Sequence, residues 1–133
     1  MFTALDSRLY FNYAYFNSLS GLPHRPRFFD SSSSSDGMIF VTVATDESGV
    51  ELQPLRFVVQ ARLRGSVAVE EFEMVVFGYR DGEPVHFTLD GFTQEGEEPQ
   101  VYDLTAVCSN EFGKSEESHV ISVTLQFSTG MHD

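Results

Sequence analysis

Apolar and polar side chains alternate along residues 55–64 of this chain. The apolar positions of this stretch are Leu55, Phe57, Val59, Ala61 and Leu63. Successive side chains of a strand point to opposite faces of a sheet, so the alternation predicts a half-buried strand. Residues 71–80 also alternate, with Phe72, Met74 and Val76 on one face and Glu71, Glu73, Val75, Phe77 and Tyr79 on the other. The second run therefore predicts a second strand.

These two strands predict a register for their own pairing. With Val59 opposite Val76, the apolar faces match, and the charged residues of the outer face fall into two pairs of opposite sign. Those two pairs are Arg64 with Glu71 and Arg62 with Glu73. A slip of one residue would destroy this match, because it turns every side chain to the other face. The connection at 65–69 is short enough for a hairpin.

The dipeptide Asp81-Gly82 predicts a further tight hairpin turn, since Asp-Gly favours the positive φ angles of type I′ turns. Pairing across this turn places Val76 opposite Phe87 and Met74 opposite Leu89. The sequence therefore predicts a central three-stranded meander from Leu55 to Gly91.

Three further strands are predicted, at Met38–Thr45, Val101–Ser109 and Ser118–Ser128. In the last two, the expected inward residues are Tyr102, Leu104, Ala106, Cys108, Ile121, Val123, Leu125 and Phe127. At least six strands without an expected helix indicate an all-β protein built as an antiparallel sandwich.

The N-terminal part of the chain differs in composition from the rest. Residues 1–30 hold eight of the 18 aromatic side chains, and the low-complexity run Ser31–Ser35 follows them. We therefore divide the chain into an aromatic arm or extra strand (1–30), a Ser-rich linker (31–37), an acidic body (38–128) and a tail (129–133). The arm contributes candidate interaction residues Tyr10, Phe11, Tyr13, Tyr15 and Phe16. Its pattern fits a strand or a capped helix, and clustered aromatics favour the strand.

The charge of −12 is also unevenly distributed, with +1 on residues 1–35 and −13 on the rest. An acidic body disfavours nucleic acid and suits either solubility alone or a basic partner. The acidic loop contributes three further interaction candidates, Glu95, Glu97 and Glu98.

Residues 102–116, which begin with Tyr102 and contain Asn110-Glu111-Phe112-Gly113, resemble the last two strands of fibronectin type III and related immunoglobulin-like sandwiches. The resemblance extends over Phe87–Phe127. It implies that Tyr102 is the corner tyrosine, whose hydroxyl bonds back to the backbone, and that the protein is a binding or spacer module. A jelly-roll-like sandwich stays open, because the predicted meander does not switch sheets.

Candidate chemistry is sparse in the sequence. The four histidines lack metal-ligand spacing, and the single Cys108 alternates with core residues, so we expect an inert buried thiol. We therefore expect no catalytic, cofactor or metal site. We also expect no signal peptide or membrane span, which favours a cytoplasmic or virion location.

The expected function is that of a non-catalytic structural or assembly protein that contacts itself or a neighbouring subunit. A subunit or decoration of a virus or phage particle fits this expectation. The alternative is a stand-alone acidic binding module or inhibitor that engages a basic protein.

Overall fold

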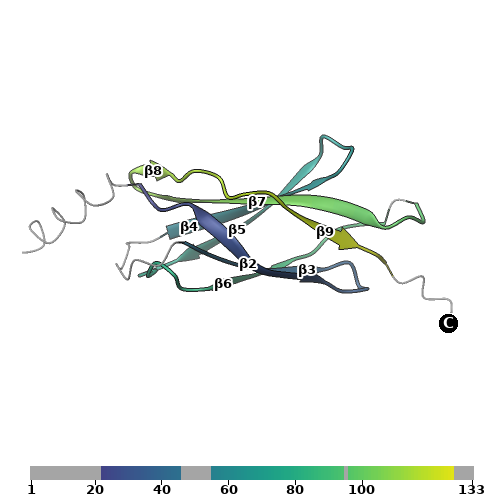
Figure 1. Ribbon diagram of the computed structural model, residues 1–133, viewed down its shortest axis with the longest axis horizontal. Helices are drawn as coiled ribbons and strands as arrows, with labels where there is room; N and C mark the ends of the chain where they lie inside the picture. Colours follow the sequence, from purple (N-terminus) through teal and green to yellow (C-terminus); the bar gives the residue numbers. More distant parts are fainter. Residues whose placement is uncertain (1–21, 46–54, 95, 128–133) are drawn as a thin grey trace, which may run out of the picture.

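The computed structural model describes residues 22–45, 55–94 and 96–127, which form two antiparallel sheets packed face to face (Figure 1). The described strands are β2 (Pro26–Ser33), β3 (Ile39–Thr45), β4 (Leu55–Leu63), β5 (Val69–Val76), β6 (Val85–Leu89), β7 (Gln100–Asn110), β8 (Gly113–Lys114) and β9 (Ile121–Leu125). One sheet has the order β2-β3-β6. The other has the order β5-β4-β7, with β8 and β9 both paired to β7. The predicted all-β antiparallel sandwich is confirmed.

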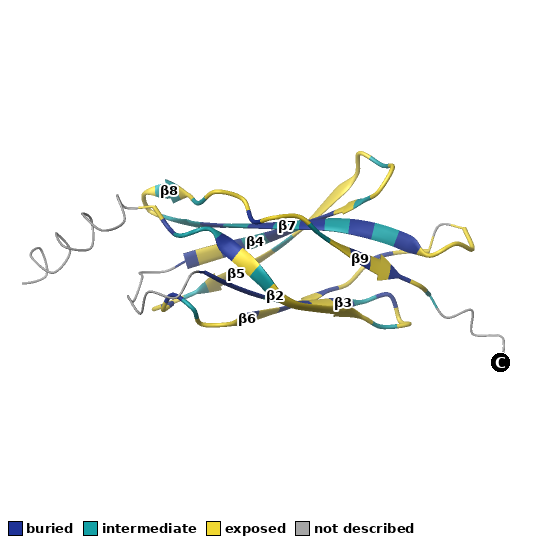
Figure 2. Ribbon diagram, in the orientation of Figure 1, coloured by how far each residue is buried: buried dark blue, intermediate teal, exposed yellow. Residues whose placement is uncertain are grey.

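The core lies between the two sheets, where alternate side chains of β4, β6 and β7 are buried (Figure 2). In β4 these are Leu55, Phe57, Val59 and Ala61, and in β7 they are Tyr102, Leu104, Ala106 and Cys108. The predicted inner faces of both strands are therefore confirmed. Of the inward residues expected in the last strand, Val123 and Leu125 are buried, whereas Ile121 and Phe127 are partly buried against the core.

The predicted three-stranded meander is wrong, because β6 pairs with β3 and leaves the sheet that contains β5. Phe87 lies opposite Val41, and Leu89 lies opposite Ile39. The residues between β5 and β6 explain the switch. A turn at Phe77-Gly78, where Gly78 has a φ of 66°, ends the alternation, and Tyr79 turns into the core instead of facing outward.

Tyr79 then joins the two sheets. Its ring packs edge-on against Phe57, with the ring centroids 5.0 Å apart. Its hydroxyl accepts from the backbone N–H of Thr45 at 3.1 Å and donates to the carbonyl of Glu83 at 2.6 Å. The Thr45 hydroxyl donates to Asp81 at 2.6 Å. Asp81-Gly82 does form a turn, closed by a bond from Glu83 N–H to the Arg80 carbonyl. The strand that follows this turn is β6, which pairs with β3 and not with β5.

The predicted hairpin of β4 and β5 exists, but its register is different. Val59 lies opposite Phe72, and Val76 lies opposite Leu55. The turn begins earlier than predicted, because Gly65 adopts a φ of 87° and Ser66 N–H bonds to the Leu63 carbonyl. The displacement is four residues, which is an even number, so the two faces of each strand are unchanged.

The charged residues of the outer face consequently pair differently from the prediction. Glu73 contacts Arg56 at 3.0 Å, and Glu71 accepts a bond from Gln60 at 2.6 Å. Arg64 donates to Asp103 at 2.7 Å, and this bond lowers the pKa of the Asp103 carboxyl from its ordinary value.

The expected boundary between arm and linker does not agree with the strands. Ser31–Ser33 belong to β2, which pairs with β3 and continues into a turn at residues 34–37. Serine at the polar, exposed positions of an edge strand is compatible with pairing, so low complexity here does not break the sheet. Residues 26–30 thus complete the chain's own sheet, while residues 1–21 and 128–133 lie outside the described part.

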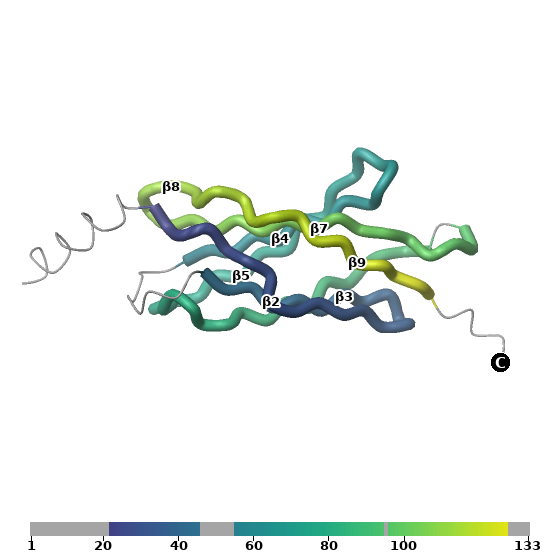
Figure 3. The backbone as a smooth tube through the Cα atoms, in the orientation of Figure 1, coloured from purple at the N-terminus to yellow at the C-terminus, as the bar shows by residue number. Residues whose placement is uncertain are grey.

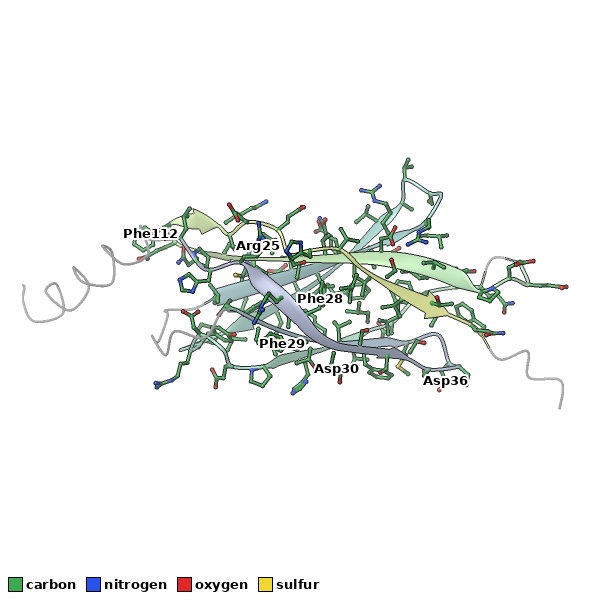
Figure 4. All side chains as sticks on the ribbon, viewed as in Figure 1. Arg25, Phe28, Phe29, Asp30, Asp36 and Phe112 are labelled. Atoms are coloured by element: carbon green, nitrogen blue, oxygen red, sulfur yellow. The ribbon has the colours of Figure 1, made fainter. Side chains whose placement is uncertain are left out.

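β2 closes one side of the sandwich. It contacts β9 and β7 of the other sheet, and Ser33 donates to the Thr124 carbonyl at 3.0 Å. Just before β2, Arg25 contacts Glu116 at 2.7 Å. A bulge between Phe28 and Asp30 bends the strand where it crosses between sheets (Figure 4). β6 and β5 are the edge strands farthest from β2 and β9 in their respective sheets.

Candidate functional site

Exposed apolar side chains concentrate in one short stretch of the described chain. Ten large hydrophobic residues are exposed, and five of them fall within residues 67–77. These five are Val67, Val69, Met74, Val75 and Phe77, with exposed fractions from 36% to 91%. Single exposed apolar residues are ordinary, but several on one element mark that element as a candidate contact region. This stretch comprises the β4–β5 loop, β5 and the residue that follows it.

β5 is also an open edge of its sheet. It pairs with β4 along its full length, and no strand among the described residues pairs with its other side. The unpaired N–H and C=O groups of such an edge can pair with another strand. In Figure 3, the β4–β5 hairpin projects beyond the rest of the sandwich.

The other edges are better protected against pairing. β2 starts with Pro26, carries a bulge and lies against β9. β6 and β9 have five residues each, and Pro84 precedes β6. β5 has eight residues and neither proline nor bulge. Short strands, prolines and bulges all discourage edge pairing, so β5 is the edge most open to a partner.

Three glutamates accompany the apolar residues of β5. Glu71 and Glu73 lie on the outer face and bond to Gln60 and Arg56 of β4. Glu70 lies opposite Ala61, on the side of the sheet that faces inward, and it is exposed. The edge therefore combines apolar contact area with negative charge.

A small cavity opens beside the hairpin end of β5. It has a volume of about 90 Å³, and its lining includes Ser66, Ala68, Glu70, Gly91, Phe92 and Tyr102. The rings of Phe92 and Tyr102 lie 4.6 Å apart, and Phe72 approaches Phe92 at 5.8 Å. Small residues on the hairpin leave this hollow, and the aromatic residues Phe92 and Tyr102 and the acidic residue Glu70 border it.

A second cluster of polar groups lies inside the sandwich, around Asp81. The Asp81 carboxylate is fully buried, accepts from Thr45, and lies 3.3 Å from Nδ1 of His24. Burial raises the pKa of the neighbouring Tyr79 hydroxyl. The partners of this cluster belong to β3, the segment before β2 and the turn before β6, so its contacts hold these two connecting segments against the end of β3.

Cys108 is buried, as predicted, and its thiol donates to the carbonyl of His24 at 3.2 Å. Burial raises the pKa of this thiol to about 12. A thiolate is the reactive form of cysteine, so this thiol is inert at neutral pH.

The residues predicted as interaction sites are not brought together by the described structure. Tyr10, Phe11, Tyr13, Tyr15, Phe16 and Glu95 lie outside the described residues. Glu97 and Glu98 are exposed on the connection between β6 and β7. Within residues 22–45, 55–94 and 96–127, no three His, Cys, Asp or Glu side chains are grouped to hold a metal ion. In the same residues, no helix has the length and hydropathy of a membrane span.

The edge of β5 was not among the interaction sites predicted from the sequence, although the sequence carries a signal for it. Val75 and Phe77 sit among the glutamates at outward positions, while Phe72, Met74 and Val76 alternate with them. A strand with apolar residues on both faces needs cover on both. Only the strand order reveals that β6 pairs with β3 instead of β5 and so leaves this edge of β5 open.

The Tyr102 hydroxyl accepts from the side-chain amide of Gln100 at 2.9 Å, and the same amide donates to the Thr93 carbonyl at 3.1 Å. Gln100 thereby connects the tyrosine to the segment that precedes β7. A direct bond from the hydroxyl to the backbone stays a prediction.

Comparison with known proteins identifies the fold. No protein-family model and no curated protein matches the chain. Among solved structures, the FN5 domain of Drosophila Lar aligns with a TM-score of 0.53 at 15% identity, over 80% of this chain and 99% of that one. A family 76 glycoside hydrolase from a bovine Bacteroides thetaiotaomicron strain aligns with a TM-score of 0.48 at 11% identity, over 73% of this chain and 19% of that one. The first alignment and the sheet switch after β5 agree with the resemblance seen in the sequence, and the chain folds as a fibronectin type III-like β-sandwich.

Proposed function

We propose that this chain is a non-catalytic protein-interaction module whose partner adds a strand along the open edge of β5. The observation that carries the proposal is that one strand has both exposed apolar side chains, at Val69, Met74 and Val75, and an unpaired backbone edge. In strand addition, main-chain hydrogen bonds supply affinity, and alternate side chains supply specificity. Each element of that recognition is available on β5.

The charge of β5 favours a basic partner over a second copy of the chain. Antiparallel pairing of two β5 strands about Phe72 would place Glu71 of each copy opposite Glu73 of the other. Like charges directly opposite each other destabilise a pair of strands. The net charge of −12 adds to this repulsion. A strand that carries lysine or arginine relieves it.

This argument supports the second of the two functions expected from the sequence, the acidic module that engages a basic protein. The assembly function, as a subunit or decoration of a virus or phage particle, depends on the aromatic arm. Residues 1–21, which hold the interaction candidates of the arm, lie outside the described part of the chain, so that function stays a prediction.

The test is amide hydrogen exchange by NMR with a ten-residue peptide of alternating valine and lysine. We expect the peptide to slow exchange at those β5 amides that do not face β4. A peptide N-methylated at every second residue keeps its charge but loses the hydrogen-bonding edge. Equal binding by the methylated peptide, or protection that maps to another strand, would show that β5 addition is not the binding mode.

A pair of double variants separates the apolar contact from charge. Val75→Lys/Phe77→Lys places two lysines on the proposed surface, and both residues are well exposed at 42% and 78%. Phe29→Lys/Phe40→Lys makes the same change of charge on the other sheet, also at exposed positions. We expect the first variant to lose peptide binding and the second to retain it. Equal losses of peptide binding in both variants would show that net charge alone accounts for the interaction.

A further inference from the structure

The cavity beside Glu70 suggests which side chain such a partner carries. A strand paired with β5 extends the rows of side chains that already cross the sheet. One of these rows runs from Leu104 on β7 through Ala61 on β4 to Glu70 on β5. The partner residue opposite Glu70 therefore starts beside this carboxylate, on the side of the sheet where the cavity opens.

We propose that the cavity receives an arginine side chain from the strand that pairs with β5, an inference that rests on the proposed function. The carboxylate of Glu70 supplies a counter-charge, and Phe92 and Tyr102 supply aromatic surface. A guanidinium is planar, stacks on aromatic rings and matches a carboxylate with two parallel donors. Lysine offers the charge without that planar fit.

The size of the cavity is compatible with this occupant. One water needs about 10–15 Å³ of such a cavity, so its volume has room for roughly six water-sized groups. The space exists because small residues line it: Ser66, Ala68 and Gly91. Ala68 and Glu70 both line this space, so a side chain that enters it lies next to both residues.

The test compares nine-residue peptides of alternating valine and threonine that differ at one central position. The central residue is arginine, lysine or citrulline, which keeps the shape of arginine and removes its charge. We expect arginine to bind about fivefold more tightly than citrulline, the scale of one exposed ion pair plus one cation–π contact, with lysine between them.

Two variants of the protein locate this preference. Glu70→Gln should make the arginine and citrulline peptides bind alike. Ala68→Leu should abolish the preference by filling the cavity. Glu97→Gln, on the exposed connection between β6 and β7, removes the same charge and should leave the preference intact. A preference that survives both Glu70→Gln and Ala68→Leu would overturn the proposal.

The outcomes separate this inference from the proposed function. Protection of β5 by all three peptides without any arginine preference keeps strand addition and refutes the arginine site. The complementary probe is N-acetylarginine N-methylamide at millimolar concentration, which needs no strand pairing. Amide shifts at Ala68 and Phe92 with this probe, together with failure of every peptide to protect β5, would support the cavity and refute strand addition. No such shifts and no arginine preference would refute the arginine site.

Discussion

The side chain of Tyr79 shows how a single residue can direct the path of the chain. Its ring fills the core against Phe57, and its hydroxyl connects the end of β3 to the segment before β6. Its two shortest hydrogen bonds are with backbone groups. An unpaired backbone group in the interior is costly, so these bonds help to hold residues 79–89 against β3.

We predict that Tyr79→Phe lowers the free energy of unfolding by about 1–3 kcal/mol, because it leaves Thr45 N–H and the Glu83 carbonyl without this partner. Urea denaturation measures the change. Tyr102→Phe is the comparison, since that hydroxyl accepts from a side-chain amide, that of Gln100, rather than from the backbone. A loss below about 0.5 kcal/mol for Tyr79→Phe, the scale of surface substitutions, would assign the role of Tyr79 to ring packing alone.

The raised pKa of Cys108 predicts that the stability of the folded chain depends on pH in the alkaline range. Its ordinary thiol pKa of 9.0 is raised to about 12 in the folded chain. The unfolded chain therefore loses this proton first, and the stability that the neutral thiol contributes is complete below pH 9 and is lost as the pH rises toward 12. Relative to Cys108→Ala, the wild-type stability should fall by up to about 1.4 kcal/mol per pH unit in this window. Parallel pH profiles, measured by urea denaturation, would contradict a raised pKa.

At the scale of elements, the pairing of β4 with β5 shows which features the sequence can predict. Alternation specifies the face of each residue, and the faces of β4 and β7 are as predicted. It does not distinguish registers that differ by an even number of residues, because these leave the faces unchanged. The actual register depends on where the turn begins, at Gly65, and agrees with the contacts that Arg56 and Gln60 make with Glu73 and Glu71 of β5.

Paired cysteines test this register. Arg62 lies directly opposite Val69, so Arg62→Cys/Val69→Cys should form a disulfide on mild oxidation. Arg62→Cys/Glu73→Cys, the pairing predicted from charge, should stay reduced, because the two Cα atoms are too far apart for a bridge. Mass spectrometry after thiol labelling distinguishes the two results. A disulfide only in the second variant would restore the register expected from the sequence.

At the scale of the whole molecule, the sheet switch and the open edge could not be predicted from local patterns. The Asp81-Gly82 turn looks the same whether it joins strands of one sheet or of two. The choice depends on Tyr79 and Asp81, whose partner Thr45 is more than 30 residues away in the sequence. The candidate site follows from that choice, since the departure of β6 leaves one edge of β5 without a neighbouring strand among the described residues.

The aromatic arm makes a separate prediction about assembly. If the first 21 residues of the arm mediate assembly, light scattering should find an oligomer for the full chain and a monomer for residues 22–133. This truncation keeps β2, whose loss would expose the edge of β3 and confuse the result. A monomer in both cases would remove the arm as an assembly element and favour the binding module.

Salt dependence tests the acidic character of the module. Exposed charges are screened beyond about 8 Å at physiological ionic strength. With −13 on residues 36–133, the affinity for the valine–lysine peptide should fall steadily as sodium chloride is raised. An affinity that is constant from low to high salt would show that the acidic residues do not contribute to recognition.

The course of β2 has a mechanical consequence. The first and last described residues lie at opposite ends of the sandwich (Figure 3). A force applied between these ends pulls β2 along its own axis, while β3 holds it through hydrogen bonds that run perpendicular to that axis. The load is then shared by all the bonds of the pair at once, as in shear, rather than breaking them one after another. A chain of this design should resist tension at its ends more strongly than its modest number of bonds would suggest, and this load does not act on the edge of β5.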